Sequence, residues 1–297
     1  MRIDGRTRLA GVVGWPVEHS LSPAMHNAAY EELDLNWVYL ALPAPDQGAL
    51  FRLADAARSS AFVGFNVTMP HKRAVLELCD EVAMLAQMAG AVNTVHCVEG
   101  RLVGYNTDSR GLLESLQAEA QFNAEGRRIA IIGAGGAAGA AVAGFILGKA
   151  THLSIVNRDV ARAEQLMTRV EPYLRGLEVS LETIDAGAEQ AVREADLVIN
   201  ATPLGMKVGD ASPIPVEWFR PDQVVYDMVY LPTDTAFLEG ARLAGARALG
   251  GLGMLVAQGA LAVDIWTENP QQRAPREVMR TSAEDAISRL ASDGETS

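Results

Sequence analysis

A glycine-rich segment near the middle of the chain has the residues and spacing of a phosphate-binding turn. Residues 131–139 read Ile-Ile-Gly-Ala-Gly-Gly-Ala-Ala-Gly, between an apolar run that predicts a buried strand and a run that predicts a helix. Backbone N–H groups at the start of a helix lack intrahelical acceptors, and the helix dipole favours an anion there. The segment therefore predicts a site for the pyrophosphate of a dinucleotide. The residues at this turn are Gly133, Ala134, Gly135, Gly136 and Ala137.

The residues after the next predicted strand, over 153–156, indicate which dinucleotide binds. An acidic residue at this point binds the ribose 2′-OH of NAD, whereas an arginine accommodates the 2′-phosphate of NADP. Here the strand is followed by Asn157, Arg158 and Asp159, with Arg162 close behind. Helical spacing places Arg162 on the same side as Arg158, so we expect NADP as the cofactor. Asp159 acts against this because a carboxylate repels phosphate, unless it only caps the following helix and the arginines are ordinary surface charges.

A lysine in the first hundred residues is the candidate for proton transfer. The segment Asn66-Val-Thr68-Met-Pro-His-Lys72 ends a strand predicted over 61–67 and opens a helix predicted over 71–79. Strand alternation points Asn66 and Thr68 the same way. A cation in the first turn of a helix opposes the helix dipole, so Lys72 has no structural reason to be there. Transfer of a proton is chemistry that suits such a lysine.

Other polar residues open helices or lie in apolar surroundings. Ser20 and Ser22 precede a predicted helix and are placed to hold a carboxylate, although Ser22 alone is typical of an N-cap. Asn93 alone is a hairpin residue, and Asp108 alone is an N-cap. In combination with Lys72 they predict a polar site.

Alternating strands and helices must position these residues. The first group has strands predicted over 9–14, 37–42 and 61–67, helices over 23–33, 47–57 and 71–79, and a hairpin over 91–105. The second group has strands predicted over 129–132, 153–156, 197–201 and 224–228, and helices over 137–147, 160–170, 188–194 and 235–244. Helices over 252–266 and 276–290 follow.

This pattern predicts an α/β protein of two domains. We expect an N-terminal, mostly parallel α/β substrate domain over 1–107, completed by 252–297, and a Rossmann-type, NADP-binding domain over 108–251. The active site is expected in the cleft between them.

Composition excludes several classes of partner. The net charge of −12 argues against nucleic acid and acidic membranes, and 49% hydrophobic residues are enough for large cores. Cys79 and Cys97 form no CxxC pair and the N-terminus has no apolar signal core, so we expect a cytoplasmic protein. No histidines have the spacing of a helical metal pair, and we expect no metal. A small-molecule substrate is the expected partner, and a homodimer is left open.

Taken in order, these motifs resemble the shikimate dehydrogenase family from about Val12 to Leu290. The resemblance rests on the segments GWPVEHSLSP at 14–23, NVTMPHK at 66–72, AGAVNT at 89–94, GYNTD at 104–108, NATP at 200–203 and GLGMLVAQ at 251–258. It implies reversible, NADP-dependent reduction of 3-dehydroshikimate to shikimate in aromatic amino-acid (chorismate) biosynthesis.

The resemblance also implies roles for individual residues. Lys72 and Asp108 match the catalytic pair that handles the hydroxyl proton. The residues that match the family's substrate-binding positions are Ser20, Ser22, Asn66, Thr68, Asn93, Asp108, Tyr230 and Gln258. Ala201, Met228 and Gly251 match positions near the nicotinamide.

Two residues depart from the family pattern. Ser109 stands where a glycine often follows the aspartate, and Asp159 stands where NADP-specific members usually have Thr or Ser. The alternative enzyme is therefore a quinate/shikimate dehydrogenase that uses NAD or both cofactors. The alternative of another class is a catalytically silent nucleotide-sensing protein, against which the presence of both Lys72 and Asp108 argues.

Overall fold

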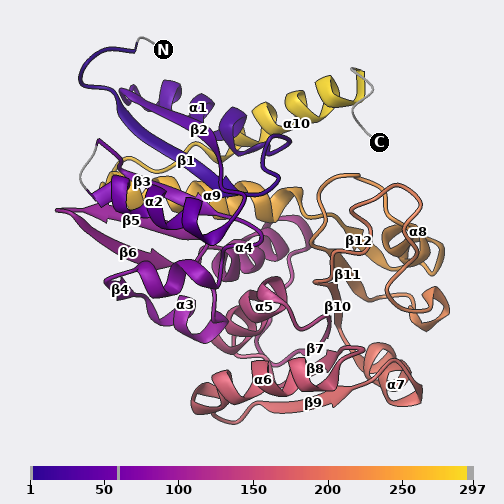
Figure 1. Ribbon diagram of the computed structural model, residues 1–297. Coiled ribbons are helices and arrows are strands. Elements are labelled where there is room, and N and C mark those ends of the chain that lie inside the picture. The colour runs from indigo at the N-terminus through magenta and orange to yellow at the C-terminus, as the bar shows by residue number, and fades with distance from the viewer. Residues whose placement is uncertain (1–2, 59–60, 293–297) are drawn as a thin grey trace. The chain divides into compact units, whose positions relative to one another are not determined.

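The computed structural model describes residues 3–58 and 61–292, which form two compact units (Figure 1). Unit 1 holds the chain up to Thr107 together with the part from Val256 onward, and unit 2 runs from Asp108 to Leu255. The chain was expected to return to the first domain at residue 252, whereas the division lies just inside α9 (Leu252–Thr267). Each unit has its own sheet and core, as the two-domain α/β prediction requires.

The sheet of unit 1 has six strands in the order β2-β1-β3-β5-β6-β4. The strands are β1 (Arg8–Gly14), β2 (Trp37–Pro43), β3 (Gly64–Val67), β4 (Glu81–Val82), β5 (Thr94–Val98) and β6 (Arg101–Tyr105). β1 pairs in parallel with β2 and β3, and β4 with β6. Only β5 is antiparallel to its neighbours, and it forms the predicted hairpin with β6. The mostly parallel sheet is confirmed.

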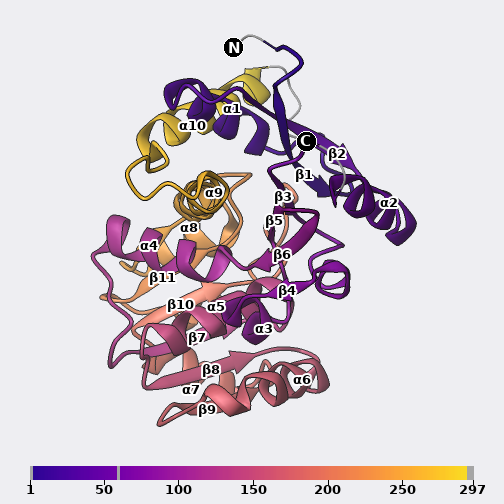
Figure 2. The same ribbon diagram turned by 90° about the vertical axis from the view of Figure 1, so that its left-hand side faces the viewer.

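Helices cover this sheet and include two from the C-terminal part of the chain. They are α1 (Ser22–Glu32), α2 (Gln47–Arg58), α3 (Met84–Ala89), α9 and α10 (Arg276–Ser292). α1 and α10 pack side by side in Figure 2. The core between sheet and helices includes Phe65, Val67, Val95 and Leu102, all buried. Trp266 of α9 donates through Nε1 to the Val95 carbonyl at 3.0 Å, so α9 is bonded to the sheet of unit 1.

The helix predicted over 71–79 is wrong. Only a short 3₁₀ helix, η1 (Ala74–Leu78), forms, and Lys72 lies in the turn before it. The Lys72 carbonyl accepts from the Val92 backbone N–H at 2.8 Å and is held by the neighbouring segment. The argument that a helix dipole acts on Lys72 therefore does not apply.

The sheet of unit 2 is parallel throughout, with the order β12-β11-β10-β7-β8-β9. The strands are β7 (Arg128–Ile132), β8 (His152–Val156), β9 (Glu178–Glu182), β10 (Leu197–Asn200), β11 (Val224–Asp227) and β12 (Arg247–Leu249). The order reverses between β7 and β10, and such a switch point is where dinucleotides bind in open α/β sheets. The predicted Rossmann-type domain is confirmed. The strands β9 and β12, at the two edges, are not predicted from the sequence because charged residues interrupt the apolar run: Glu178 and Glu182 in β9, and Arg247 in β12.

Separate hydrophobic clusters cover the two faces of this sheet. One face is packed by α4 (Asp108–Ala120), α5 (Gly136–Leu147) and α6 (Val160–Val170), and the other by α7 (Ala186–Glu194) and α8 (Ala236–Leu243). α5 is apolar because it is buried, with the side chains of Val142 and Phe145 fully enclosed. Among residues 3–58 and 61–292, no helix has the length and apolar character needed to cross a membrane.

Candidate active site

The turn from β7 into α5 forms an open cradle of backbone. Gly133 has a φ of +115°, and a side chain there would begin 3.0 Å from the Ala201 carbonyl oxygen. Gly135 is the N-cap of α5 and supplies no side chain to cap it. A Cβ on Gly135 would meet nothing within 4 Å. The N–H groups of Gly136 and Ala137 at the helix start are therefore available to an anion.

The carboxyl ends of the neighbouring strands line up beside this turn. The Ala201 N–H donates to the Ile132 carbonyl at 2.9 Å, which fixes Ala201 next to the end of β7. The Met228 N–H donates to the Asn200 carbonyl at 3.0 Å. A side chain on Gly251 would collide with the Met228 carbonyl, so the two backbones touch. The structure thus brings Ala201, Met228 and Gly251 to one edge of the sheet.

A buried carboxylate that the sequence reading missed holds two of these strand ends together. Asp227 accepts hydrogen bonds from Asn200 Nδ2 at 2.9 Å, the Val229 N–H at 3.0 Å and Thr235 Oγ1 at 2.7 Å. Burial raises the pKa of this carboxyl, and the three donors act in the opposite direction. Asn200 in turn accepts through Oδ1 from the Thr202 N–H at 3.0 Å. The pair therefore fixes the loops after β10 and β11.

The segment after β8 is closed by local contacts. Asp159 is the N-cap of α6, and its carboxylate accepts from the Arg162 N–H at 3.4 Å and pairs with Arg162 Nε at 3.3 Å. Asn157 Nδ2 donates to the Asp159 carbonyl at 2.6 Å. Arg158 is exposed and lies before the helix. Because Arg158 lies outside α6, helical spacing does not apply to the two arginines; Arg162 contacts Asp159, which caps the helix.

Unit 1 contains a buried chain of polar side chains where the carboxyl ends of β3 and β6 meet the amino end of the antiparallel β5. Asn66 Nδ2 donates to Thr94 Oγ1 at 2.9 Å and to the Asn93 carbonyl at 3.2 Å. Asn93 Nδ2 donates to Thr107 Oγ1 at 2.9 Å and to Gln258 Oε1 at 3.3 Å. Three predicted residues, Asn66, Asn93 and Gln258, thus belong to one network, which presents amide and hydroxyl groups of the kind that bind a polyhydroxylated ring.

Ser22 is not the N-cap of the helix, contrary to the capping alternative considered for it. The N-cap of α1 is Leu21, without a side-chain hydrogen bond, and Ser22 is the first helical residue. Ser20 Oγ accepts from the Ser22 N–H at 3.3 Å. Ser22 is buried and Ser20 is half-buried. Because its hydroxyl is not used as a cap, Ser22 is left with the role of a ligand contact or a partner inside the core.

The remaining predicted residues lie at the ends of strands or at the start of a helix. Thr68 follows β3, and its N–H donates to the Val13 carbonyl at 2.8 Å. Lys72 is half-buried beside Val92, one residue before Asn93. Asp108 is buried and opens α4, where the helix dipole favours its charge. Tyr230 follows β11 and is half-buried.

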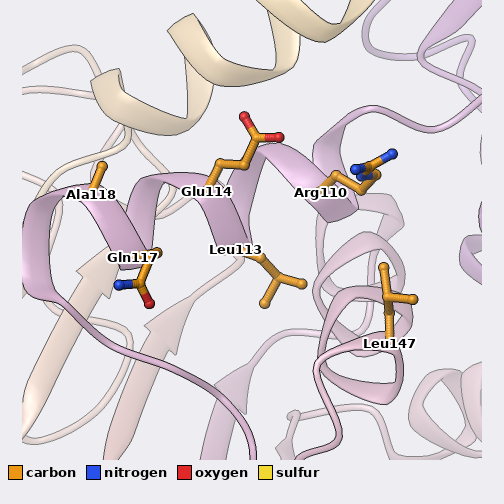
Figure 3. Close-up of a pocket in the computed structure, with 6 residues that line it drawn as sticks. All are labelled: Arg110, Leu113, Glu114, Gln117, Ala118 and Leu147. Carbon is orange, nitrogen blue, oxygen red and sulfur yellow. The ribbon is translucent and has the colours of Figure 1, made fainter.

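A hollow of about 430 Å³ on unit 2 contains none of the predicted residues (Figure 3). It is lined by Arg110, Leu113, Glu114, Gln117, Ala118 and Leu147. Leu147 ends α5, whose opposite end carries the glycine-rich turn. The hollow therefore lies away from the phosphate cradle. In the part of the chain that the structure describes, no group of three or more His, Cys, Asp or Glu side chains could hold a metal ion.

Comparison with known proteins decides the family. Residues 12–95 match the shikimate dehydrogenase substrate binding domain, residues 116–208 match shikimate / quinate 5-dehydrogenase, and residues 251–284 match the shikimate 5′-dehydrogenase C-terminal domain. A shikimate dehydrogenase (NADP⁺) of Methanopyrus kandleri is 44% identical over 94% of this chain and 95% of its own length. The chain belongs to the shikimate dehydrogenase family.

Solved structures of shikimate dehydrogenases share the fold. A complex with NADP⁺ has a TM-score of 0.88 and 38% identity, covering 96% of this chain and 98% of the other. The Listeria monocytogenes shikimate 5-dehydrogenase, in complex with shikimate and NAD, has a TM-score of 0.86 and 35% identity, covering 95% and 98%. Enzymes of this family are thus known with either dinucleotide.

Ser109, which departs from the family pattern, is fully buried at a close approach of two helices. A side chain on Gly144 of α5 would begin 2.8 Å from the Ser109 carbonyl oxygen, so Gly144 lets α5 approach the backbone of α4 here.

Proposed function

We propose that the chain catalyses the reversible, NADP-dependent reduction of 3-dehydroshikimate to shikimate, a step of aromatic amino-acid biosynthesis. The observation that carries the proposal is the polar network of Asn66, Asn93 and Gln258, in a chain of this family that also has both Lys72 and Asp108. A nucleotide-sensing protein without activity would need none of these groups.

Residues of unit 2 fit a dinucleotide. The open cradle at Gly133, Gly135 and Gly136 suits the pyrophosphate, because a side chain at Gly133 would press on the Ala201 carbonyl. The exposed Arg158 offers its guanidinium to a 2′-phosphate. When bound, the reduced dinucleotide, NADPH, would supply the hydride for the reduction. Ala201, Met228 and Gly251 would then face the nicotinamide, with Asn157 and Arg162 near the adenosine end.

Residues of unit 1, together with Tyr230 of unit 2, would hold the substrate. Ser20 and Ser22 are assigned to its carboxylate together with Tyr230, and Asn66, Thr68, Asn93 and Gln258 to its ring hydroxyls. The hydrogen bonds of the network fix the orientation of the side chains that would contact the ligand. Asn93 Oδ1 already accepts from the Thr107 N–H at 2.7 Å, so its amide plane is fixed before a ligand arrives. A preorganised amide binds a hydroxyl at a lower entropic cost.

Lys72 and Asp108 are the proposed catalytic pair. Reduction adds a hydride to the carbonyl carbon and a proton to the carbonyl oxygen, so the protein must deliver one proton to that oxygen. The Lys72 ammonium gives this proton, and the Asp108 carboxylate orients the ammonium and the new hydroxyl. In the oxidative direction the same lysine takes the hydroxyl proton back.

Initial rates with shikimate and with quinate, each with NAD⁺ and NADP⁺, test the proposal. Of the four combinations, shikimate with NADP⁺ is expected to have the highest kcat/KM. The reaction is monitored by the absorbance of the reduced nicotinamide. Absence of turnover in all four combinations would refute the enzymatic assignment.

Asp159 favours a second candidate, a quinate/shikimate dehydrogenase that uses NAD or both cofactors. The Asp159 carboxylate pairs with the Arg162 guanidinium. Arg158 would then be the one arginine of the two that faces a 2′-phosphate. Equal kcat/KM values for NAD⁺ and NADP⁺, or turnover of quinate as fast as shikimate, would favour this candidate.

A cytoplasmic homodimer completes the proposal. Leu40 is 46% exposed on β2, an edge strand of unit 1, and offers an apolar contact to a second copy. Size-exclusion chromatography with light scattering would give the mass of a dimer, and Leu40→Asp would shift it to the monomer. Fractionation of cells should place the activity in the cytoplasm.

A further inference from the structure

The buried hydroxyl of Tyr39, in the middle of β2, makes a hydrogen bond that packing of the ring does not require. The ring is fully buried, and Oη donates to Asn66 Oδ1 at 2.7 Å. The Ser22 side chain is the second polar neighbour of this phenol. Tyr39 thus links α1 and β3, the elements that carry two of the proposed substrate contacts.

Nearby Tyr30 shows that burial alone does not demand such a partner. Tyr30 is equally buried, and the centroid of its ring lies 6.5 Å from that of the Tyr39 ring. Within the described residues, the Tyr30 hydroxyl has no hydrogen-bond partner. The two tyrosines therefore differ in what their hydroxyls do, although both fill the core.

The contacts of Asn66 show what the Tyr39 hydroxyl fixes. The Asn93 carbonyl can only accept, so the Nδ2 group of Asn66 must face it at 3.2 Å. Oδ1 must then face Tyr39, which donates. Loss of this donor would leave a buried carbonyl oxygen unsatisfied and free the amide to rotate.

Tyr39 is itself held rigidly. Its backbone N–H donates to Asn27 Oδ1 and its carbonyl accepts from Asn27 Nδ2, both at 2.9 Å. Its ring stacks on His26 with centroids 4.1 Å apart and planes 18° apart. A side chain fixed on backbone and ring can hold another side chain in one orientation.

We infer that Tyr39 is a positioning residue for substrate binding: its hydroxyl orients the Asn66 amide beside Ser22 before the ligand arrives. The inference rests on the proposed function, since it assigns Asn66 to the ring hydroxyls of shikimate. It gives Tyr39 an effect on substrate affinity without any contact between Tyr39 and substrate, cofactor or the reacting atoms.

The test compares Tyr39→Phe with Tyr30→Phe in the full chain. Tyr39→Phe should raise the KM and the calorimetric Kd for shikimate about three- to tenfold, the loss expected for one buried hydrogen bond. Its kcat and its KM for NADP⁺ should stay within about twofold of wild type. Tyr30→Phe, which removes a hydroxyl without a partner, should leave all four quantities unchanged.

A double-mutant cycle separates positioning from general support of the fold. With Asn66→Ala, the further change Tyr39→Phe should add less than about twofold to the shikimate KM, because the oriented group is already gone. Should Tyr39→Phe fail to fold, Thr94→Val removes the other side-chain partner of the Asn66 amide, together with the bonds from Thr94 Oγ1 to Asn93 and Thr107, and should raise the shikimate KM at least as much.

Three results would overturn the inference. They are a wild-type shikimate KM in Tyr39→Phe (or in Thr94→Val, where that variant replaces it), an equal rise in the NADP⁺ KM, and a full effect in the Asn66→Ala background. A wild-type protein without turnover would instead refute the proposed function, so the two failures are distinguishable.

Discussion

Protonation of His26 should destabilise the protein in mild acid. This histidine is completely buried on α1, with Nδ1 2.9 Å from the Ser22 carbonyl and its ring stacked on Tyr39. Its Nε2 has no hydrogen-bond partner among the described residues. Burial lowers the pKa of His26 from 6.5 to about 4, because the charged ring cannot be solvated there.

The sign and size of the effect follow from linkage. Since the folded pKa lies below the unfolded one, the unfolded chain binds the proton more readily, and stability falls as the pH drops below about 6.5. From pH 7 to pH 5 the loss is about 2 kcal/mol, and it approaches about 3 kcal/mol near pH 4. Burial also lowers the pKa of His96, which acts in the same direction.

Urea unfolding at pH 7 and pH 5 measures this loss. His26→Leu should be less sensitive than wild type to the pH change by about 2 kcal/mol, whatever its stability at pH 7. Tyr30→Phe, in the same aromatic cluster, should keep the wild-type sensitivity. If His26→Leu and wild type lose the same stability between the two pH values, the reasoning about the buried ring is wrong.

Three further predictions concern the proposed site. Lys72→Ala should lower kcat by about 10²- to 10⁴-fold, with a smaller change in the shikimate KM, and a near-native kcat would remove Lys72 from the mechanism. Arg158→Ala should raise the KM for NADP⁺ by about 10- to 100-fold and leave the KM for NAD⁺ nearly unchanged, whereas equal losses would show that Arg158 does not recognise the 2′-phosphate. Asp227→Ala leaves the three donors to its carboxylate without an acceptor and should lower the free energy of unfolding by about 2–4 kcal/mol. Asp227→Asn should lower it clearly less, and similar urea midpoints for the two variants would contradict this.

Most strands and helices could be predicted because each buries one face in the core of its own unit, and this burial sets the spacing of its apolar residues. α6, predicted over 160–170, has those bounds because Asp159 caps it and Val170 closes its buried face. The edge strands β9 and β12 could not be found, since edge positions tolerate charged residues that weaken the pattern. The failed helix around Lys72 has another cause: a tertiary bond from Val92 takes the Lys72 carbonyl, and local propensity does not report it.

The candidate site was predictable where chemistry is local and obscure where it depends on distant partners. The glycine turn is contiguous, so its sequence suffices. Tyr39 reads as one more buried aromatic, because its bond partner Asn66 lies on another strand. Asp227 reads as the polar end of a strand until Asn200 and Thr235 are seen to meet on it. The assigned roles of the individual site residues stay predictions.

The interrupted course of unit 1 has a consequence for how the protein is made. The ribosome delivers β1 to β6 first, but Trp266, which closes the core over Val95, arrives only after the whole of unit 2. Unit 2 is continuous in sequence and can close its own sheet while the remaining chain is still being synthesised. A chain that stops after Leu255 would therefore carry the dinucleotide-type fold of unit 2, while the sheet of unit 1 would lack its last helices. Until the last helices are synthesised, the N-terminal part of unit 1 would expose apolar surface. Strands β1 to β6 are therefore the segment most in need of a chaperone.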